Sequence, residues 1–265
     1  MRLVILTAYR RGTASYCLPD LLQHTGAEIV HVIHSEGRIA RKKDHYRRKL
    51  RKMLKIGLPG ALNGIRMRKW YHITEAGGRP VGELETICRE NNIPFTSVPA
   101  MNGQETRELL NALGPDLALS LGNSYISPKV FSIPKYGTLN LHGEVLPDYQ
   151  NAQSVIWQLY NGSNVTGYTL HKMEKQIDTG EILKQEIFPI IFEPTLGQTV
   201  TATCAEILRR SSLGLVETVN HFEEYYSRRR PQGTGKSYTT PSLGQFLRIL
   251  RNYKRLRGQQ PAPIK

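Results

Sequence analysis

Apolar positions along the chain alternate between short β-rich runs and stretches with helical spacing. Residues 2–6 form a β-rich run that ends in a polar, glycine-containing loop. A helix at residues 17–24 and a second strand at residues 28–33 follow. The same pattern predicts helices at residues 81–90 and 105–112 and strands at residues 94–98 and 117–121. Strands separated by helices predict an α/β fold with a Rossmann-like, mostly parallel open sheet and helices on both faces.

The second half of the chain continues with a strand, a short helix and two further strands. These are predicted at residues 138–142, 154–160, 165–173 and 181–190. A loop and one long helix follow at residues 193–221, and a short helix is centred on residues 243–257. We therefore expect a main domain over residues 1–190, with a basic helical insertion at residues 38–70, and a C-terminal helix and basic tail over residues 191–265.

The segment 38–69 combines strong positive charge with helical apolar spacing. It contains thirteen Lys or Arg and one acid, and Tyr46, Leu50, Met53 and Leu54 recur at helical spacing. This pattern predicts a basic amphipathic helix, which a Gly-Leu-Pro-Gly run then breaks. One interpretation is a solvated helix packed on the sheet by its apolar side. The other is a patch for a phosphorylated substrate or for peripheral contact with an acidic membrane.

Charge and cysteine content narrow the class of protein. The 36 Lys and Arg against 22 Asp and Glu give a net charge of +14, which favours anionic partners without specifying one. The 3 cysteines form no CxxC pair, so neither a disulfide framework nor a metal site is expected. No cleavable leader or membrane span is predicted either. We therefore expect a soluble cytoplasmic protein.

Asn140, His142 and Asp178 are the residues with the clearest chemical potential. Asn140 and His142 are two positions apart on a predicted strand, so they project from the same face near its C-terminal end, where open α/β sheets bind ligands. Asp178 follows on a turn between two strands. Taken singly, each has an ordinary explanation: a turn cap, a core histidine and a local Asx turn. No phosphate-binding glycine motif accompanies them.

The stretch around these residues resembles the formyltransferase family, which includes methionyl-tRNA formyltransferase, glycinamide ribonucleotide transformylase and the nucleotide-sugar N-formyltransferases. The family's linked motifs occur here in the family's order, as Asn140-Leu-His142, Leu146-Pro-Asp-Tyr149, Thr166-Gly-Tyr-Thr169 and Asp178-Thr-Gly180. Two departures stand beside the catalytic strand. Gly143-Glu144 replaces the usual Pro-Ser, and Asn151 replaces a usual Gly, so we expect the acceptor contacts to differ.

The resemblance implies formyl transfer from N10-formyltetrahydrofolate to an amine, without a metal. His142 would accept the amine proton, Asn140 would donate to the developing oxyanion, and Asp178 would orient His142. Because the amine itself attacks, direct transfer is expected. By resemblance, the pterin lies in an apolar pocket formed by two segments. The residues expected there are Leu121, Gly122, Ser124, Tyr125, Ile126 and Ile177.

The acceptor is expected to be a nucleotide-linked amino sugar, with a 4-amino-4,6-dideoxy sugar for surface polysaccharide favoured. The region after the long helix is too short for the further tRNA domain of methionyl-tRNA formyltransferases, and the run 169–173 and the tail look more like the nucleotide-sugar enzymes. Candidate acceptor contacts are Arg10, Arg11, Tyr149 and Gln150. We also expect a homodimer.

Three alternatives remain open from the sequence. Formyltetrahydrofolate hydrolase shares the catalytic arrangement and uses water as nucleophile. Glycinamide ribonucleotide is another small acceptor. An inactive formyltransferase-like domain that serves as a basic RNA- or membrane-binding module is an alternative of a different class.

Overall fold

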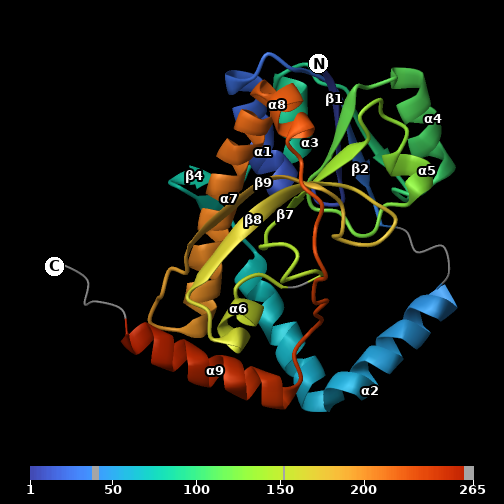
Figure 1. Ribbon diagram of the computed structural model, residues 1–265. Coiled ribbons are helices and arrows are strands. Elements are labelled where there is room, and N and C mark those ends of the chain that lie inside the picture. Colours follow the sequence, from blue (N-terminus) through green and yellow to red (C-terminus); the bar gives the residue numbers. More distant parts are fainter. Residues whose placement is uncertain (38–41, 152, 260–265) are drawn as a thin grey trace.

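A seven-stranded sheet forms the centre of the molecule in the computed structural model, which describes residues 1–37, 42–151 and 153–259 (Figure 1). The strand order is β5-β2-β1-β6-β7-β8-β9. The strands span Phe95–Val98 (β5), Glu28–Ser35 (β2), Arg2–Thr7 (β1), Leu117–Ser120 (β6), Thr138–His142 (β7), Val165–Lys172 (β8) and Ile182–Pro189 (β9). The first five in this order are parallel, and β8 and β9 are each antiparallel to the preceding strand.

Helices cover both faces of the sheet because its central strands are apolar on both faces. On β1, Leu3 and Ile5 enter one core cluster, whereas Val4 and Leu6 enter another, as the two-residue period of a strand requires. The first cluster includes helices α1 (Thr13–His24), α3 (Leu84–Glu90) and α7 (Leu196–Asn220). The second includes α4 (Gln104–Leu113) and α5 (Pro128–Phe131). The predicted fold class is therefore confirmed.

The remaining elements lie around this sandwich. They are α2 (Lys42–Met67), the 3-10 helix η1 (Arg68–Tyr71), the hairpin β3 (Glu75–Ala76) and β4 (Arg79–Pro80), α6 (Ile156–Asn161), α8 (Phe222–Ser227) and α9 (Leu243–Gly258). Within the described residues, no helix is long and apolar enough to cross a bilayer.

Most predicted elements occur within a few residues of their expected positions, and β7 matches its predicted range. The first helix is an exception, because it begins at Thr13 instead of residue 17. Its first turn is Thr13-Ala14-Ser15, which carries no large apolar residue to mark it in the sequence. Gly12 provides the turn that starts it, and Ser15 bonds back to the Gly12 backbone.

The predicted basic helix and its break are confirmed in α2, where Gly57 leaves helical geometry at φ 73° and ψ 162°. Residues 38–41 of the predicted insertion lie outside the described residues. The expected packing of its apolar side on the sheet is wrong, since Leu50, Met53 and Leu54 are all exposed. The half of α2 before Gly57 projects away from the sheet, so no core surface is available to that side (Figure 1).

Candidate active site

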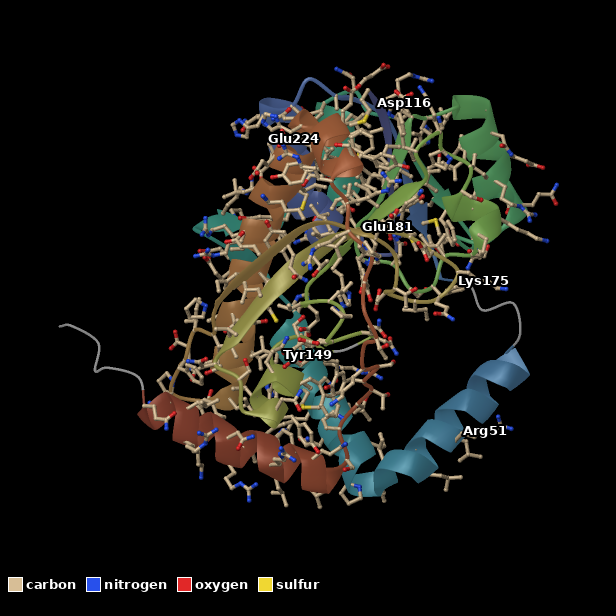
Figure 2. All side chains as sticks on the ribbon, viewed as in Figure 1. Arg51, Asp116, Tyr149, Lys175, Glu181 and Glu224 are labelled. Carbon is tan, nitrogen blue, oxygen red and sulfur yellow. The ribbon has the colours of Figure 1, made fainter. Side chains whose placement is uncertain are left out.

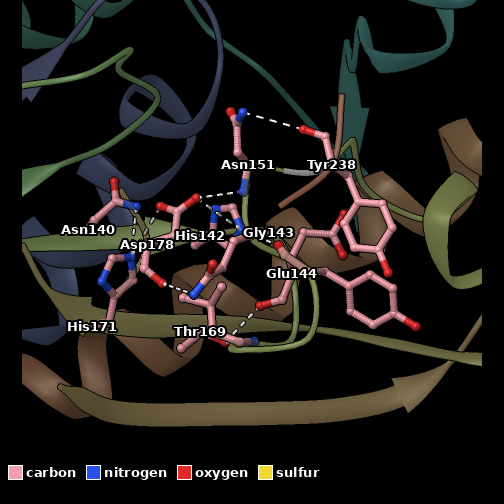
Figure 3. A network of polar contacts seen from close by, with 12 residues as sticks. Asn140, His142, Gly143, Glu144, Asn151, Thr169, His171, Asp178 and Tyr238 are labelled. Carbon is pink, nitrogen blue, oxygen red and sulfur yellow. Dashed lines mark hydrogen bonds and ion pairs between the residues drawn. The ribbon is translucent and has the colours of Figure 1, made fainter. Parts of the chain in front are cut away.

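The register between β7 and β8 sets the floor of the candidate site. Asn140 lies directly opposite His171, and His142 lies directly opposite Thr169. Opposed residues of an antiparallel pair project to the same face, so these four side chains form one patch at the end of β7 (Figure 3). Two of them were predicted as catalytic. His171 was not predicted as a site residue.

His171 fixes the orientation of the Asn140 amide. Its Nδ1 lies 3.0 Å from the carbonyl oxygen of Lys172, and because a carbonyl only accepts, Nδ1 carries the hydrogen. Nε2 is therefore free to accept from Asn140 Nδ2, which is 3.1 Å away. Burial, reinforced by nearby His142, lowers the pKa of His171 to about 4 and keeps the ring neutral. The second N–H of the Asn140 amide remains available to a ligand.

His142 is also held in a defined tautomer. Its Nε2 lies 3.1 Å from the carbonyl oxygen of Tyr149 and donates to it. In that arrangement Nδ1 carries the lone pair that can accept a proton. Asp178 stands between the two imidazoles, with its carboxylate oxygens 3.9 Å from His142 Nε2 and 3.7 Å from His171 Nε2. The structure therefore brings Asn140, His142 and Asp178 together, and adds His171.

The loop around Asn151 holds the Asp178 carboxylate in place. The Asn151 backbone N–H donates to Asp178 Oδ2 at 2.8 Å, and Gln150 Nε2 donates to the Asp178 carbonyl at 3.3 Å. Both Asn151 and Asp178 are left-handed, with φ 48° and 55°. Asn and Asp tolerate this conformation best after glycine. Asn151 can therefore occupy a position where the family usually has Gly.

Two glycines of the motifs allow backbone segments to approach closely behind the site. A Cβ on Gly180 would lie 1.8 Å from the Lys172 carbonyl oxygen, and a Cβ on Gly167 would lie 2.0 Å from the Glu186 carbonyl oxygen. No real Cβ is accommodated at such distances. Gly180 thus sets the path of the loop that carries Asp178, and Gly167 sets the pairing of β8 with β9.

The segment between α8 and α9 braces the same loops from outside. Gln150 N donates to Lys236 O and Tyr238 N donates to Gln150 O, at 2.9 and 3.0 Å. Gln232 Nε2 reaches the Gly180 carbonyl at 2.5 Å. The Tyr238 ring packs against Trp157, with centroids 4.6 Å apart. Sequence patterns assigned no part of the motif to this tail, because its contribution is made by tertiary contacts.

A cavity of about 380 Å³ opens on these residues. It is lined by Asn140, His142, His171, Asp178 and by apolar side chains that include Leu141 and Met173. Five of the predicted folate-pocket residues line it, namely Gly122, Ser124, Tyr125, Ile126 and Ile177. Leu121 does not line the cavity, because its side chain is buried in the first core cluster. Mixed apolar walls and a few fixed polar groups suit a heteroaromatic ligand.

A second cavity of about 580 Å³ adjoins the first, and Gly122 and Leu141 line both. Arg11 and Arg68 line it together with Gly12 and Thr13 at the start of α1. Its lining therefore combines cations with backbone N–H groups at a helix N-terminus, a combination that attracts phosphate.

The other predicted acceptor contacts lie elsewhere. Arg10 pairs with Glu85 and Glu83 and stacks on Phe95, so its charge is directed away from both cavities. The Tyr149 ring stacks on Tyr238, and the Gln150 side chain bonds to the Asp178 backbone. Tyr149 and Gln150 contact His142 and the loop that carries Asp178 instead of lining either cavity.

Glu144, one of the departures from the family pattern, is buried beside the site. Its carboxyl accepts a hydrogen bond from Gln158, and its Oε1 has no partner among the described residues. Burial raises the pKa of Glu144 to about 8. Its backbone carbonyl accepts from Thr169 Oγ1 at 2.7 Å, which ties the loop after β7 to β8. In the part of the chain that the structure describes, no group of acids, histidines or cysteines could hold a metal ion.

Known proteins share both the sequence and the shape of this region. The model of the formyl transferase family matches residues 82–207, which include the whole of β7 and β8. The methionyl-tRNA formyltransferase of Syntrophus aciditrophicus is 33% identical over 184 residues, which cover 64% of this chain and 56% of that protein. Residues 82–207 are therefore a formyl transferase domain.

Two further proteins similar to this chain are N-formyltransferases. The GDP-perosamine N-formyltransferase of Brucella melitensis is 38% identical over 104 residues, covering 39% of this chain and 40% of that protein. The N-formyltransferase of Helicobacter canadensis, solved with folinic acid and dTDP-3-aminofucose, shares the fold at a TM-score of 0.56 and 15% identity, covering 98% of this chain and 83% of that one. The chain spans about half the length of the curated relatives it matches, with 61%, 51% and 56% covered in three of them.

Proposed function

We propose that this formyltransferase moves a formyl group from N10-formyltetrahydrofolate to the amine of a nucleotide-linked amino sugar. The convergence of Asn140, His142 and Asp178 on one cavity, beside a second cavity lined by Arg11 and Arg68, carries the proposal. The similarity to a GDP-perosamine N-formyltransferase supports the choice of acceptor.

The folate would lie in the first cavity. Loop 122–126 and Ile177 would hold its pterin there, and the bound folate would supply the formyl carbon for attack. Leu141 and Met173 provide further apolar wall. The acceptor would lie in the second cavity with its phosphates near Arg11 and Arg68. Because Gly122 and Leu141 line both cavities, an amine held in the second reaches the first near His142.

Three side chains would then perform the transfer. His142 would take up the amine proton at Nδ1, since its Nε2 is occupied by the Tyr149 carbonyl. It would return this proton to the folate nitrogen N10 as the bond between N10 and the formyl carbon breaks. Asn140 donates its free amide N–H to the formyl oxygen as negative charge develops there. Asp178 stabilises the charged imidazole, because its carboxylate lies 3.9 Å from His142 Nε2.

A release assay tests the proposal. Purified protein and N10-formyltetrahydrofolate are mixed with GDP-perosamine, dTDP-linked 3- and 4-amino sugars, glycinamide ribonucleotide or methionyl-tRNA, and free folate is followed together with the formylated product. Release only with an amino-sugar nucleotide is expected. Release with methionyl-tRNA or glycinamide ribonucleotide instead would replace the acceptor class, and release without any amine would indicate a hydrolase.

His142→Ala is the matched mutational test of the mechanism. Loss of a general base lowers turnover by about 10²–10⁴-fold. His221→Ala, at an exposed histidine directly after α7, is the control and should retain full activity. Near-normal turnover of His142→Ala would exclude His142 as the base.

A further inference from the structure

Helix α2 presents large apolar side chains to solvent on both sides of its kink. Before Gly57, Leu50, Met53 and Leu54 are exposed, and after it Leu58, Leu62 and Ile65 follow at i, i+4 and i+7. Leu54, Leu58 and Ile65 are 74%, 64% and 61% exposed. We call these six residues the α2 apolar row. Apolar side chains at helical spacing form one stripe on each half of the helix, and such stripes are normally buried.

The part of α2 after the kink turns its other side to the protein. Met67 is fully buried, and Gly60 and Gly64 face the Thr240, Pro241 and Ser242 segment that leads into α9. At 100° per residue, Gly60, Gly64 and Met67 lie opposite Leu58, Leu62 and Ile65. The packed side is therefore already used, and the apolar row is the side left without a partner.

A second helix at the same end of the molecule also exposes leucines. Leu243 and Leu247 on α9 are exposed, whereas Phe246 and Ile249 of that helix are buried. Arg66 of α2 links the two helices, because its guanidinium lies 5.8 Å from the centroids of both Trp70 and Phe246. Figure 1 shows α9 and the projecting half of α2 bordering the end of the molecule opposite the N-terminus.

The sequences of these two helices are strongly basic. Segment 38–69 contains thirteen Lys or Arg and one acid, and α9 adds Arg248, Arg251, Lys254, Arg255 and Arg257. Arg51 extends from the projecting half of α2, away from the side chains of the main body (Figure 2). Exposed leucines flanked by cations are typical of a helix that lies in the interface of an anionic bilayer.

We propose that α2, with the start of α9, docks this protein on an anionic lipid surface. The leucines would enter the boundary between headgroups and acyl chains, and the flanking cations would pair with lipid phosphates and carboxylates. A second copy of the chain is a poorer occupant, because two strongly basic surfaces would face each other. RNA is also poorer, because single strands stack on aromatic rings and phosphates bind cations, and neither contact uses the Leu, Met and Ile side chains of the row.

Vesicle co-sedimentation of the full chain tests the proposal. The probes are vesicles of phosphatidylcholine alone and of phosphatidylcholine mixed with phosphatidylserine, each at low and at physiological salt. Binding is expected only to the anionic vesicles, and it should weaken as salt rises because screening removes part of the attraction. Absence of binding to anionic vesicles, or equal binding to both kinds, would overturn it.

Paired variants separate the apolar row from general surface hydrophobicity. Leu54→Ser with Leu62→Ser should weaken anionic-vesicle binding about tenfold or more. The control pair is Ile187→Ser with Leu213→Ser, which are 56% and 52% exposed on β9 and α7 and should bind like the parent. Unchanged binding by the first pair, or equal loss in both, contradicts the proposal. Sedimentation requires no substrate, so its result is independent of the formyl-transfer assay, in which both pairs should turn over normally.

A gel shift with RNA tests the alternative that the α2 apolar row binds nucleic acid instead of lipid. RNA binding that the Leu54→Ser and Leu62→Ser pair weakens, in the absence of vesicle binding, would replace the lipid surface by nucleic acid. Weak RNA binding that disappears in moderate salt and is unaffected by the pair reflects charge alone, and it supports the lipid assignment when vesicles bind.

Discussion

His171 and Glu144 are buried ionisable residues beside the catalytic strand, and burial affects them in opposite directions. For His171, burial and His142 keep the imidazole neutral, so its Nε2 accepts the Asn140 amide. For Glu144, burial favours the protonated acid. Each residue is neutral at a position where a charge would be costly. We therefore expect His171 to affect turnover through Asn140, and Glu144 to affect the pH dependence of stability.

His171 is expected to act as a positioning residue for Asn140. His171→Phe removes the acceptor of the Asn140 amide, and kcat should fall about tenfold, the value of one hydrogen bond, with little change in KM. His171→Gln, which restores an acceptor oxygen, should recover part of the loss. Steady-state kinetics on all three proteins measure the effect. An equal loss in both variants would indicate a packing role instead.

Glu144 should make the protein less stable as pH rises. Its pKa is about 8 when folded and near 4.5 when unfolded, so the folded state binds more protons between these values. The free energy of unfolding contributed by this group is thus full below pH 4.5 and falls by up to about 1.4 kcal/mol per pH unit towards pH 8. Glu144→Gln removes this dependence.

Denaturant unfolding of both proteins between pH 4.5 and pH 8 measures the difference. The variant should gain stability relative to the parent as pH rises, whereas Glu224→Gln, at an exposed acid of α8, should show no such gain. Parallel pH curves for the parent and Glu144→Gln would show that the acid is not destabilised by burial.

At the scale of elements, the pairing of β7 with β8 assembles the site. The antiparallel register places His171 opposite Asn140 and Thr169 opposite His142, and the turn after β8 returns Asp178 to the same patch. The segment between α8 and α9 then bonds to the loop at Gln150 and to the loop at Gly180. The geometry of the candidate site therefore depends on backbone approaches behind it as well as on the side chains in it.

Gly180→Ala tests this dependence. The added Cβ would meet the Lys172 carbonyl at 1.8 Å, so the loop must shift and move Asp178. We expect a loss of about 1–3 kcal/mol in stability and a larger proportional loss in kcat. Gly233→Ala in the tail, where a Cβ meets nothing within 4 Å, is the control for thermal unfolding and kinetics. Equal stability of the two variants would contradict the close approach.

At the scale of the whole molecule, the net charge of +14 and two joined cavities distinguish the surface. The positive field should attract a diphosphate acceptor and should weaken with salt. Within this field, Arg11 lines the second cavity, whereas the neighbouring Arg10 is paired with Glu85. These adjacent arginines form a natural matched pair.

Arg11→Gln should raise the KM for the nucleotide-linked acceptor about 10–100-fold and leave kcat nearly unchanged, because a charge-assisted contact to phosphate is lost. Arg10→Gln should change KM little. Kinetics over a range of salt concentrations check both, and the dependence of kcat/KM on salt should be shallower for Arg11→Gln. A larger effect of Arg10→Gln would place the acceptor on the other side of the loop.

Much of the fold and the centre of the site could be predicted from sequence because both depend on local periodicity. Strand alternation placed Asn140 and His142 on one face, and helical spacing identified α2 and α7. The motif order linked Asp178 to them. The division of the chain at residue 190 and the homodimer remain predictions.

The remaining features depend on contacts between distant segments. His171 belongs to the site only because β8 pairs with β7 in one register, which no local pattern specifies. An alternative register would have turned His171 to the other face. The same reason explains Arg10 and Arg11, which are adjacent in sequence but differ because Glu85 lies beside only one of them. Periodicity along the chain thus determined which elements form, and their tertiary packing decided which side chains meet.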